Sequence, residues 1–293
     1  MSTPSPNIAI PVDLANPGQF FACCGLLELA DRLWSGTEGR FEDEHFLVAG
    51  PPECSLRALL DKLAEAAVDN TMTPKDKTRL EKLSSMKKKE REAIPGLEEE
   101  KKSLESLRRE LPIALSGAIE FRIDWFRDEF AGGSRFKTWA GQQSVLDIAQ
   151  TMHRGLTQVI DEFNSSLWGT VRGIGLPFNF DSDLGAQGSA LDVGFSFDPL
   201  AGSETTRIET LCRPVLELLC FIGLQRFRPK EIQRENRFIY TAWSAALSPS
   251  VASAVACGAV EVGDGLVHEF KLLYRTKYLK SFLPAIPFQG DPR

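Results

Sequence analysis

DLANPGQFFACCGLLELADRLW, residues 13–34, combines a strand exit, a capped turn and an amphipathic helix. Asn16 is a favourable N-cap, Pro17 suits the first helical position, and Gln19 stands where the last residue of a capping box belongs. The apolar side chains that follow recur with a period of about 3.6 residues, which predicts one buried helical face: Phe20, Cys24, Leu27 and Trp34.

Gly25 lies inside this helical pattern. A glycine in a helix interior costs roughly 1 kcal/mol relative to alanine, and it usually marks a place where another backbone comes close. One interpretation is tight packing of the helix on a sheet. The other is a backbone that approaches a ligand or a nucleic acid. The residues alone favour packing, because glycines are common in strand–turn–helix units.

The composition of the 293-residue chain, 43% hydrophobic and 25% charged, is typical of a globular protein. No apolar run approaches the roughly 20 residues of a membrane span, and the first residues do not resemble a secretory signal. We therefore expect a cytoplasmic protein without a membrane partner. The net charge is −6, whereas nucleic-acid-binding domains are usually basic. Any nucleic-acid contact is thus expected to be local, or shared with a basic partner.

Helical and strand patterns mix without a regular βαβ period, which predicts an α+β fold with a mixed sheet, packed helices and a projecting charged helical hairpin. We expect an N-terminal α+β domain over residues 1–206 and a C-terminal α+β segment over 207–293 packed on the same core. The predicted strands are 7–13, 41–49, 119–125, 171–176, 191–197, 237–246 and 266–275. Helices are predicted from residue 17 and over 56–68, 142–160 and 208–227.

The predicted hairpin at 73–111 is dense in lysine and glutamate. Thr73 and Pro74 are start signals, and Pro95-Gly96 marks a turn between two helices. One interpretation is a solvated charged insertion, which is the commoner fate of such runs. The other is an arm that reaches a partner subunit or a phosphate backbone through Lys87-Lys88-Lys89.

Familiar catalytic motifs are missing: we find no GxxxxGK[ST] phosphate loop, no HExxH and no GxSxG. The six cysteines lack the paired spacing of a zinc site, so no metal site and no cofactor are predicted. An acidic cluster, which a magnesium-dependent nuclease would need, is formed in the sequence by Asp181, Asp183, Asp192 and Asp198. Its glycine- and serine-rich context is more typical of turns.

Three groups of residues suit contacts with nucleic acids. In the stretch 132–144, GGSRFKTWAGQQS, cations, a stacking surface and amides are supplied by Arg135, Lys137, Trp139, Gln142 and Gln143. Around 271–280, basic residues alternate with tyrosines: Lys271, Arg275, Lys277 and Lys280. A third group contains Arg226, Arg228, Lys230, Arg234 and Arg237. The alternatives are a loop whose tryptophan fills the core and a sheet edge protected by lysines. The last two groups would join if the strands near 240 and 270 pair.

Three blocks of the sequence, NPGQFFACCGLLELADRLW, FKTWAGQQSVLDIA, and GLQRFRP with LLYRTKYLKSFLP, resemble the Csb-type or large-subunit family of type I-U (I-G) CRISPR–Cas systems. The resemblance implies a non-catalytic subunit of Cascade, the crRNA-guided surveillance complex. Such a subunit senses the protospacer-adjacent motif (PAM), helps to open duplex DNA and recruits the helicase-nuclease. The implied partners are crRNA, target double-stranded DNA, the other Cascade subunits and the helicase-nuclease.

Under this resemblance, contacts to the motif or to bases are expected from Asn16, Gln19, Lys137, Gln142 and Gln143. Phosphate contacts are expected from Arg135, Arg226, Arg228, Arg237, Lys271, Arg275, Lys277 and Lys280, and Trp139 would wedge or stack where strands separate. Two other functions stay open at this point: a magnesium-dependent nuclease that uses the acidic cluster, and a purely structural scaffold subunit held by the helical hairpin.

Overall fold

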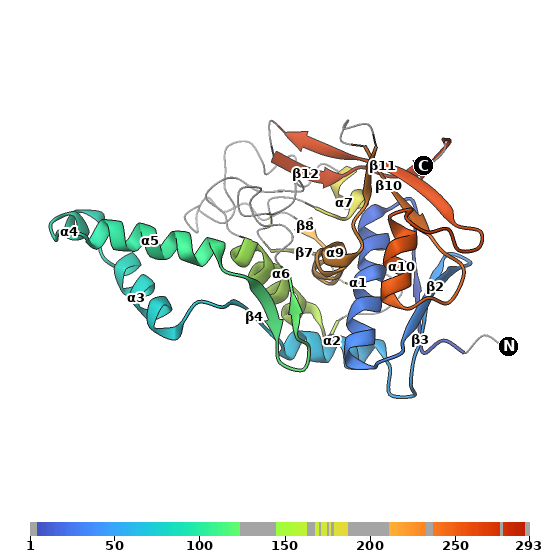
Figure 1. Ribbon diagram of the computed structural model, residues 1–293, viewed down its shortest axis with the longest axis horizontal. Helices are drawn as coiled ribbons and strands as arrows, with labels where there is room; N and C mark the ends of the chain where they lie inside the picture. The colour runs from blue at the N-terminus through green and yellow to red at the C-terminus, as the bar shows by residue number, and fades with distance from the viewer. Residues whose placement is uncertain are drawn as a thin grey trace.

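The protein has an α+β fold in which a central pair of helices is enclosed by antiparallel sheets (Figure 1). The structure is a computed structural model. It describes residues 5–123, 145–162, 168–169, 171–174, 176, 179–186, 211–232, 237–275 and 278–290. Among these residues, no helix is long and apolar enough to cross a membrane.

The first sheet has the strand order β1-β3-β2, built from β1 (Ile8–Pro11), β2 (Glu38–Glu42) and β3 (His45–Ala49). The single strand predicted over 41–49 is therefore wrong: β2 and β3 form a hairpin around Asp43 and Glu44. Both turn residues have positive φ angles, 45° and 59°, as in a type I′ turn. The sequence hides this turn because neither position is a glycine or an asparagine.

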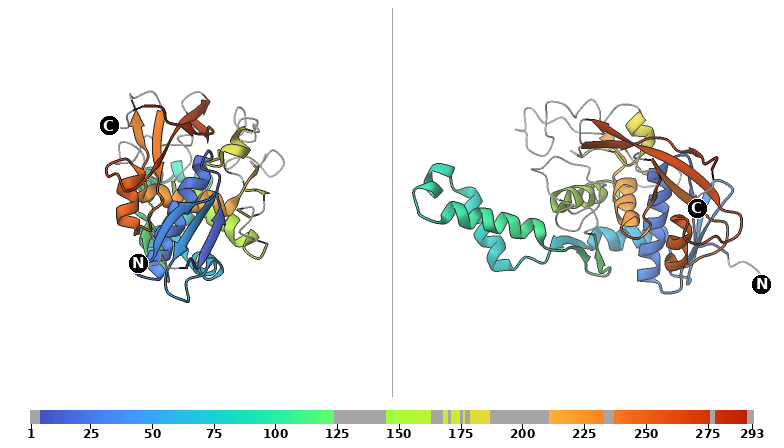
Figure 2. Two further views of the ribbon diagram at one scale, coloured as in Figure 1. Left: turned by 90° about the vertical axis from the view of Figure 1, so that its right-hand side faces the viewer. Right: turned by 45° about the horizontal axis from the view of Figure 1, so that its top comes forward.

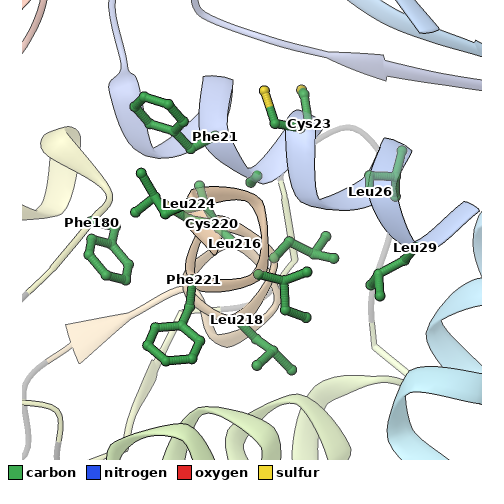
Figure 3. Packing of buried hydrophobic residues seen from close by; sticks show 14 of the residues in the cluster. Phe21, Cys23, Leu26, Leu29, Phe180, Leu216, Leu218, Cys220, Phe221 and Leu224 are labelled. Carbon is green, nitrogen blue, oxygen red and sulfur yellow. The ribbon is translucent and has the colours of Figure 1, made fainter. Parts of the chain in front are cut away.

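Helix α1 (Pro17–Leu33) begins where the caps predict and is almost entirely buried. Its main partner is α9 (Pro214–Arg226), and α9 also packs on α6 (Val145–Val159) (Figure 3). The two central helices touch through a pair of glycines. A Cβ added to Gly25 would lie 2.0 Å from the carbonyl oxygen of Leu219, and one added to Gly223 would lie 2.0 Å from that of Phe21. The packing interpretation of Gly25 is thus confirmed, but the partner is a helix and not a sheet.

The C-terminal sheet has the strand order β12-β11-β10-β9, with β13 also pairing β11. Its strands are β9 (Lys230–Ile232), β10 (Arg237–Ala242), β11 (Leu266–Arg275), β12 (Tyr278–Phe282) and β13 (Ile286–Pro287). The chain after β10 continues to α10 (Pro249–Ala256) and bonds β2 on the way, since Phe41 N donates to Trp243 O and Gly39 N to Leu247 O. The N-terminal and C-terminal sheets therefore meet at β2 (Figure 2).

One aromatic cluster fills the space between these sheets and α1. Phe20 of α1 stacks on Tyr240 of β10, with ring centroids 4.2 Å apart. Trp243 meets Phe41 of β2 edge to face. Residues on both sides of position 207 thus belong to one hydrophobic core.

The middle of the chain forms smaller elements around α6. Helix α2 (Leu56–Glu65) leads into a three-stranded sheet with the order β4-β5-β6, made of β4 (Ala67–Asn70), β5 (Ile113–Ser116) and β6 (Phe121–Arg122). Further along lie β7 (Arg172–Gly173), α7 (Ser182–Ala186) and β8 (Leu211–Cys212). The strand predicted over 191–197 falls outside the described residues.

Between β4 and β5 the chain leaves the body as a projecting arm, as predicted (Figures 1 and 2). The arm consists of α3 (Pro74–Ser85), the short α4 (Lys88–Glu92) and α5 (Leu97–Glu110). Arg79 of α3 forms a bidentate pair with Glu100 of α5, with distances of 2.7 and 2.6 Å. Arg91 bonds Glu98 at 2.8 Å and is itself buried. These pairs link the helices of the arm, alongside Leu80 and Leu83 of α3, which are buried.

Candidate functional site: a basic row on the C-terminal sheet and a cavity beside helix α1

Asn16 lies inside the molecule, at the junction of α1 with the segment 179–183. Its Oδ1 accepts from Gln19 N and Ser182 N, both at 3.3 Å, and its Nδ2 donates to Asp181 Oδ1 at 2.8 Å. Gly18 lets this segment come close, since a Cβ there would lie 2.4 Å from the carbonyl oxygen of Phe180. The structure thus gives Asn16 a role in joining two parts of the chain. Its contact with nucleic-acid bases stays a prediction.

Two buried carboxyl groups complete this junction. Asp181 is fully buried and pairs with Arg213, which is partly exposed. Glu217 of α9 is also fully buried, and its carboxylate accepts from Phe180 N at 2.9 Å and from Asp181 N at 3.1 Å. Loss of hydration raises the pKa of Glu217 to about 8, although the backbone hydrogen bonds oppose the shift.

The acidic cluster expected around Asp181 does not form a metal site within the described part of the chain. Asp181 uses Oδ1 for Asn16 and for Asp183 N, and Oδ2 for Arg213. Both carboxylate oxygens of Asp181 therefore already have partners within the protein. Asp192 and Asp198 lie outside the described residues.

Gln19 does not close the predicted capping box. Its Oε1 accepts from Asp13 N at 2.8 Å, so the side chain fixes the loop before α1 instead of the cap residue. The residue as a whole is buried, with an exposed fraction of 9%. Gln19 borders a large cavity.

The arginines predicted to contact phosphates are partly engaged by acidic partners. Arg226 pairs with Glu28, a buried residue of α1 that also holds Arg32 at 2.7 Å. Arg228 donates to Gln225 O at 3.4 Å. Arg237 forms a bidentate pair with Glu269 at 2.6 Å, and this hydrogen bonding lowers the pKa of Glu269.

Strands β10 and β11 pair, and Arg237 lies opposite Lys271. This pairing brings together the basic groups around residues 226–237 and 271–280, as predicted for paired strands. In the β9–β10 register, Lys230 is opposite Ile239, so it projects on the same side of the sheet as Arg237 and Lys271. We call these three residues the basic row. Lys271 is the most exposed member, while Ile239 on the same face is buried. The other face carries Phe238, Tyr240 and Phe270 into the core.

Several predicted contact residues are not placed by the structure. Arg275 and Lys280 belong to β11 and β12, but only their backbone is described. The remaining predicted residues lie outside the described part of the chain: Arg135, Lys137, Trp139, Gln142, Gln143 and Lys277.

A cavity of about 950 Å³, which sequence reasoning did not find, lies between the β2–β3 hairpin, the loop before α1 and the start of β11. Three non-glycine residues in the described chain have positive φ angles, namely Asp43, Glu44 and Trp168, and all three line this cavity. Strained backbone is frequent at binding sites. The one trace of this cavity in the sequence is the acidic run Glu42-Asp43-Glu44. A search for helix and strand patterns does not single out such a run.

The loop 11–15, which forms one wall of the cavity, is held by hydrogen bonds to four other parts of the chain. Val12 N donates to Glu44 O at 2.8 Å, Trp168 Nε1 to Pro11 O at 3.0 Å, and Ala285 N to Ala15 O at 2.7 Å. The Tyr240 hydroxyl donates to Leu14 O. The cavity is therefore built into the fold.

Comparison with protein-family models, with curated proteins and with solved structures finds no match to this chain.

Proposed function

We propose that this protein is a non-catalytic subunit of a crRNA-guided CRISPR surveillance complex, which contributes to PAM sensing, to target DNA binding and to recruitment of the helicase-nuclease. The proposal starts from the sequence resemblance of residues 16–34 and of the blocks around 136–149 and 223–284. The structural observation that supports it best is the basic row, because it gathers residues from two separate sequence groups on one sheet face.

The basic row has dimensions suited to a phosphate backbone. Neighbouring strands lie about 4.8 Å apart and residues rise about 3.4 Å along a strand, so the Cα atoms of Lys230 and Lys271 are about 12 Å apart. Arg237 stands between them and shares its charge with Glu269. The row thus supplies a small positive area on a chain whose net charge is −6. This limited area fits a subunit that contacts DNA locally while basic neighbours bind the rest of the phosphates.

The arm supports the part of the proposal that concerns assembly. It reaches away from the body and its tip carries Lys87-Lys88-Lys89 (Figure 1). Ile94, beside the tip, is a large apolar side chain that is half exposed. An exposed apolar group a few residues from a run of lysines is suited to contact with another subunit of the complex.

The first experiment is co-expression of the chain with its genomic neighbours and a crRNA, followed by purification through a tag on a different subunit. We expect this chain and the crRNA in the same complex. If the chain purifies alone and free of RNA, the proposal is wrong.

The second experiment measures how the affinity of the assembled complex for duplex DNA depends on salt. Each lysine that contacts a phosphate adds about 0.9 to the slope of log affinity against log salt. Lys230→Ala with Lys271→Ala should therefore lower this slope by about 1.8. The control is Arg57→Ala with Lys62→Ala on α2, two exposed residues that already pair with carboxylates. A slope that is the same in both double variants would contradict a DNA contact at the basic row.

A further inference from the structure

A buried carboxylate lies beside the basic row, on the same face of the sheet. Glu269 of β11 is opposite Ile239 of β10 and Ile286 of β13, so its two cross-strand neighbours are apolar. Arg237 is its diagonal neighbour, because Arg237 is opposite Lys271, two residues further along β11. Diagonal neighbours lie about 7 to 8 Å apart, which is within reach of long side chains. The register of the sheet therefore brings Glu269 to Arg237.

The contact between these two side chains fixes the orientation of the guanidinium group. Nε and Nη2 of Arg237 donate to the two carboxylate oxygens of Glu269, both at 2.6 Å. A bidentate pair of this kind sets the plane of the guanidinium group as well as its position. It uses two of the five N–H donors of an arginine, and Nη1 lies on the far side of the group from the carboxylate.

The two partners differ in how deeply they are buried. The side chain of Glu269 is 8% exposed, whereas that of Arg237 is 29% exposed. An anion that approaches from the solvent therefore meets Arg237 first and does not need to displace Glu269. Hydrogen bonding to Arg237 lowers the pKa of Glu269, so the carboxyl group is ionised at neutral pH. A buried carboxylate without its cation is strongly unfavourable, so the pair should stay closed when an anion binds.

We propose that Glu269 is a positioning residue, which holds the guanidinium group of Arg237 between Lys230 and Lys271 in the orientation that contacts a phosphate of the DNA backbone. This inference rests on the proposed function and names a residue that acts at the same site. An arginine that is already held in one orientation loses less conformational freedom on binding than a mobile one. The alternative is that Glu269 competes with phosphate for Arg237, and the two roles predict opposite effects when the pair is broken.

The test measures the affinity of the assembled complex for duplex DNA at several salt concentrations, with the wild type and Glu269→Asp. This substitution keeps the charge but shortens the side chain, so the carboxylate no longer reaches both nitrogen atoms of Arg237. We expect about fivefold weaker binding, which corresponds to ordering one long side chain at an interface. The slope of log affinity against log salt should fall by up to about 0.9, the share of one phosphate contact. Unchanged affinity would overturn the inference, and tighter binding would overturn it in favour of competition.

Two further variants separate positioning from a general effect on the fold. Glu42→Asp makes the same change in β2, where Glu42 pairs with Arg40 at 2.7 Å, and its affinity for DNA should stay within about twofold of the wild type. Arg237→Gln keeps a hydrogen-bond donor for the buried Glu269 but has no guanidinium group. In that background Glu269→Asp should have no further effect on affinity. A loss of about fivefold there as well would mean that Glu269 does not act through Arg237, and would overturn the inference.

This inference and the proposed function fail in different ways. If Lys230→Ala with Lys271→Ala leaves the salt slope unchanged, the basic row does not contact DNA, and the role of Glu269 falls with that part of the proposed function. If this double variant lowers the slope while Glu269→Asp binds DNA as the wild type does, the DNA contact stands and Glu269 has no positioning role.

Discussion

Replacing Gly25 by alanine tests whether close contact between α1 and α9 holds the core together. The added Cβ would lie 2.0 Å from the carbonyl oxygen of Leu219 and 2.9 Å from the amide nitrogen of Gly223. Both are backbone atoms, so no side-chain rotation relieves the overlap. The two helices must move apart by more than 1 Å, which is enough to lose a quarter to a half of the dispersion energy of each contact pair between them.

Overpacking of a rigid core usually costs about 1 to 3 kcal/mol. Alanine regains about 1 kcal/mol through its higher helix propensity. Here the contact involves the most buried helices of the described chain, and many side chains lose contact together. We therefore expect a net destabilisation of about 3 kcal/mol in Gly25→Ala, and a similar value in Gly223→Ala.

The free energy of unfolding is measured by urea denaturation, monitored by tryptophan fluorescence and by circular dichroism. Gly155→Ala in α6 is the control, because its Cβ would meet only side chains, the nearest being Ile174 Cδ1 at 2.9 Å. That variant should lose clearly less stability. The double variant Gly25→Ala, Gly223→Ala should lose less than the sum of the single variants, since either one alone already separates the helices. If Gly25→Ala is as stable as the wild type, or more stable, the reasoning is refuted.

Two further predictions concern the buried carboxyl groups. Between pH 4.5 and about 8 the folded chain holds a proton on Glu217 that the unfolded chain has released, so the free energy of unfolding should fall as pH rises through this window, by at most about 1.4 kcal/mol per pH unit. Glu217→Gln should flatten that pH dependence in urea titrations, and an unchanged slope would show that Glu217 does not titrate in this range. Arg213→Met leaves the fully buried Asp181 without its cation and should cost about 3 to 5 kcal/mol. Adding Asp181→Asn should recover part of this loss, whereas a loss that is unchanged or larger would argue against an ion-pair origin.

The local features of the fold were predictable because their signals are contiguous in the sequence. Asn16 and Pro17 start α1, Thr73 and Pro74 start the arm, and the alternating pattern at 266–275 forms β11 with those bounds. The β2–β3 hairpin was not predictable in the same way. Its turn residues, Asp43 and Glu44, adopt a left-handed backbone, and β3 of the hairpin pairs with β1, a strand more than thirty positions earlier in the chain.

The candidate sites, too, were predictable from the sequence only in part. Sequence alone identified Arg237 and Lys271 as basic residues near strands, and pairing of those strands placed them opposite each other. The sequence did not reveal that Glu269 and Glu28 would engage the neighbouring arginines, because such pairs depend on which elements meet in space. Gly25 pointed to close packing, yet only the structure showed that Gly223 of another helix is its counterpart.

By itself, the sequence determined where α1, the arm and the long C-terminal strands begin, since caps, prolines and apolar periodicity act between residues a few positions apart. The tertiary structure alone decided the Asn16–Asp181 junction, whose members are 165 positions apart, and the acidic cavity that it borders. The physical reason is that burial strengthens polar interactions and shifts the pKa of groups such as Glu217, and burial exists only after distant segments have packed together.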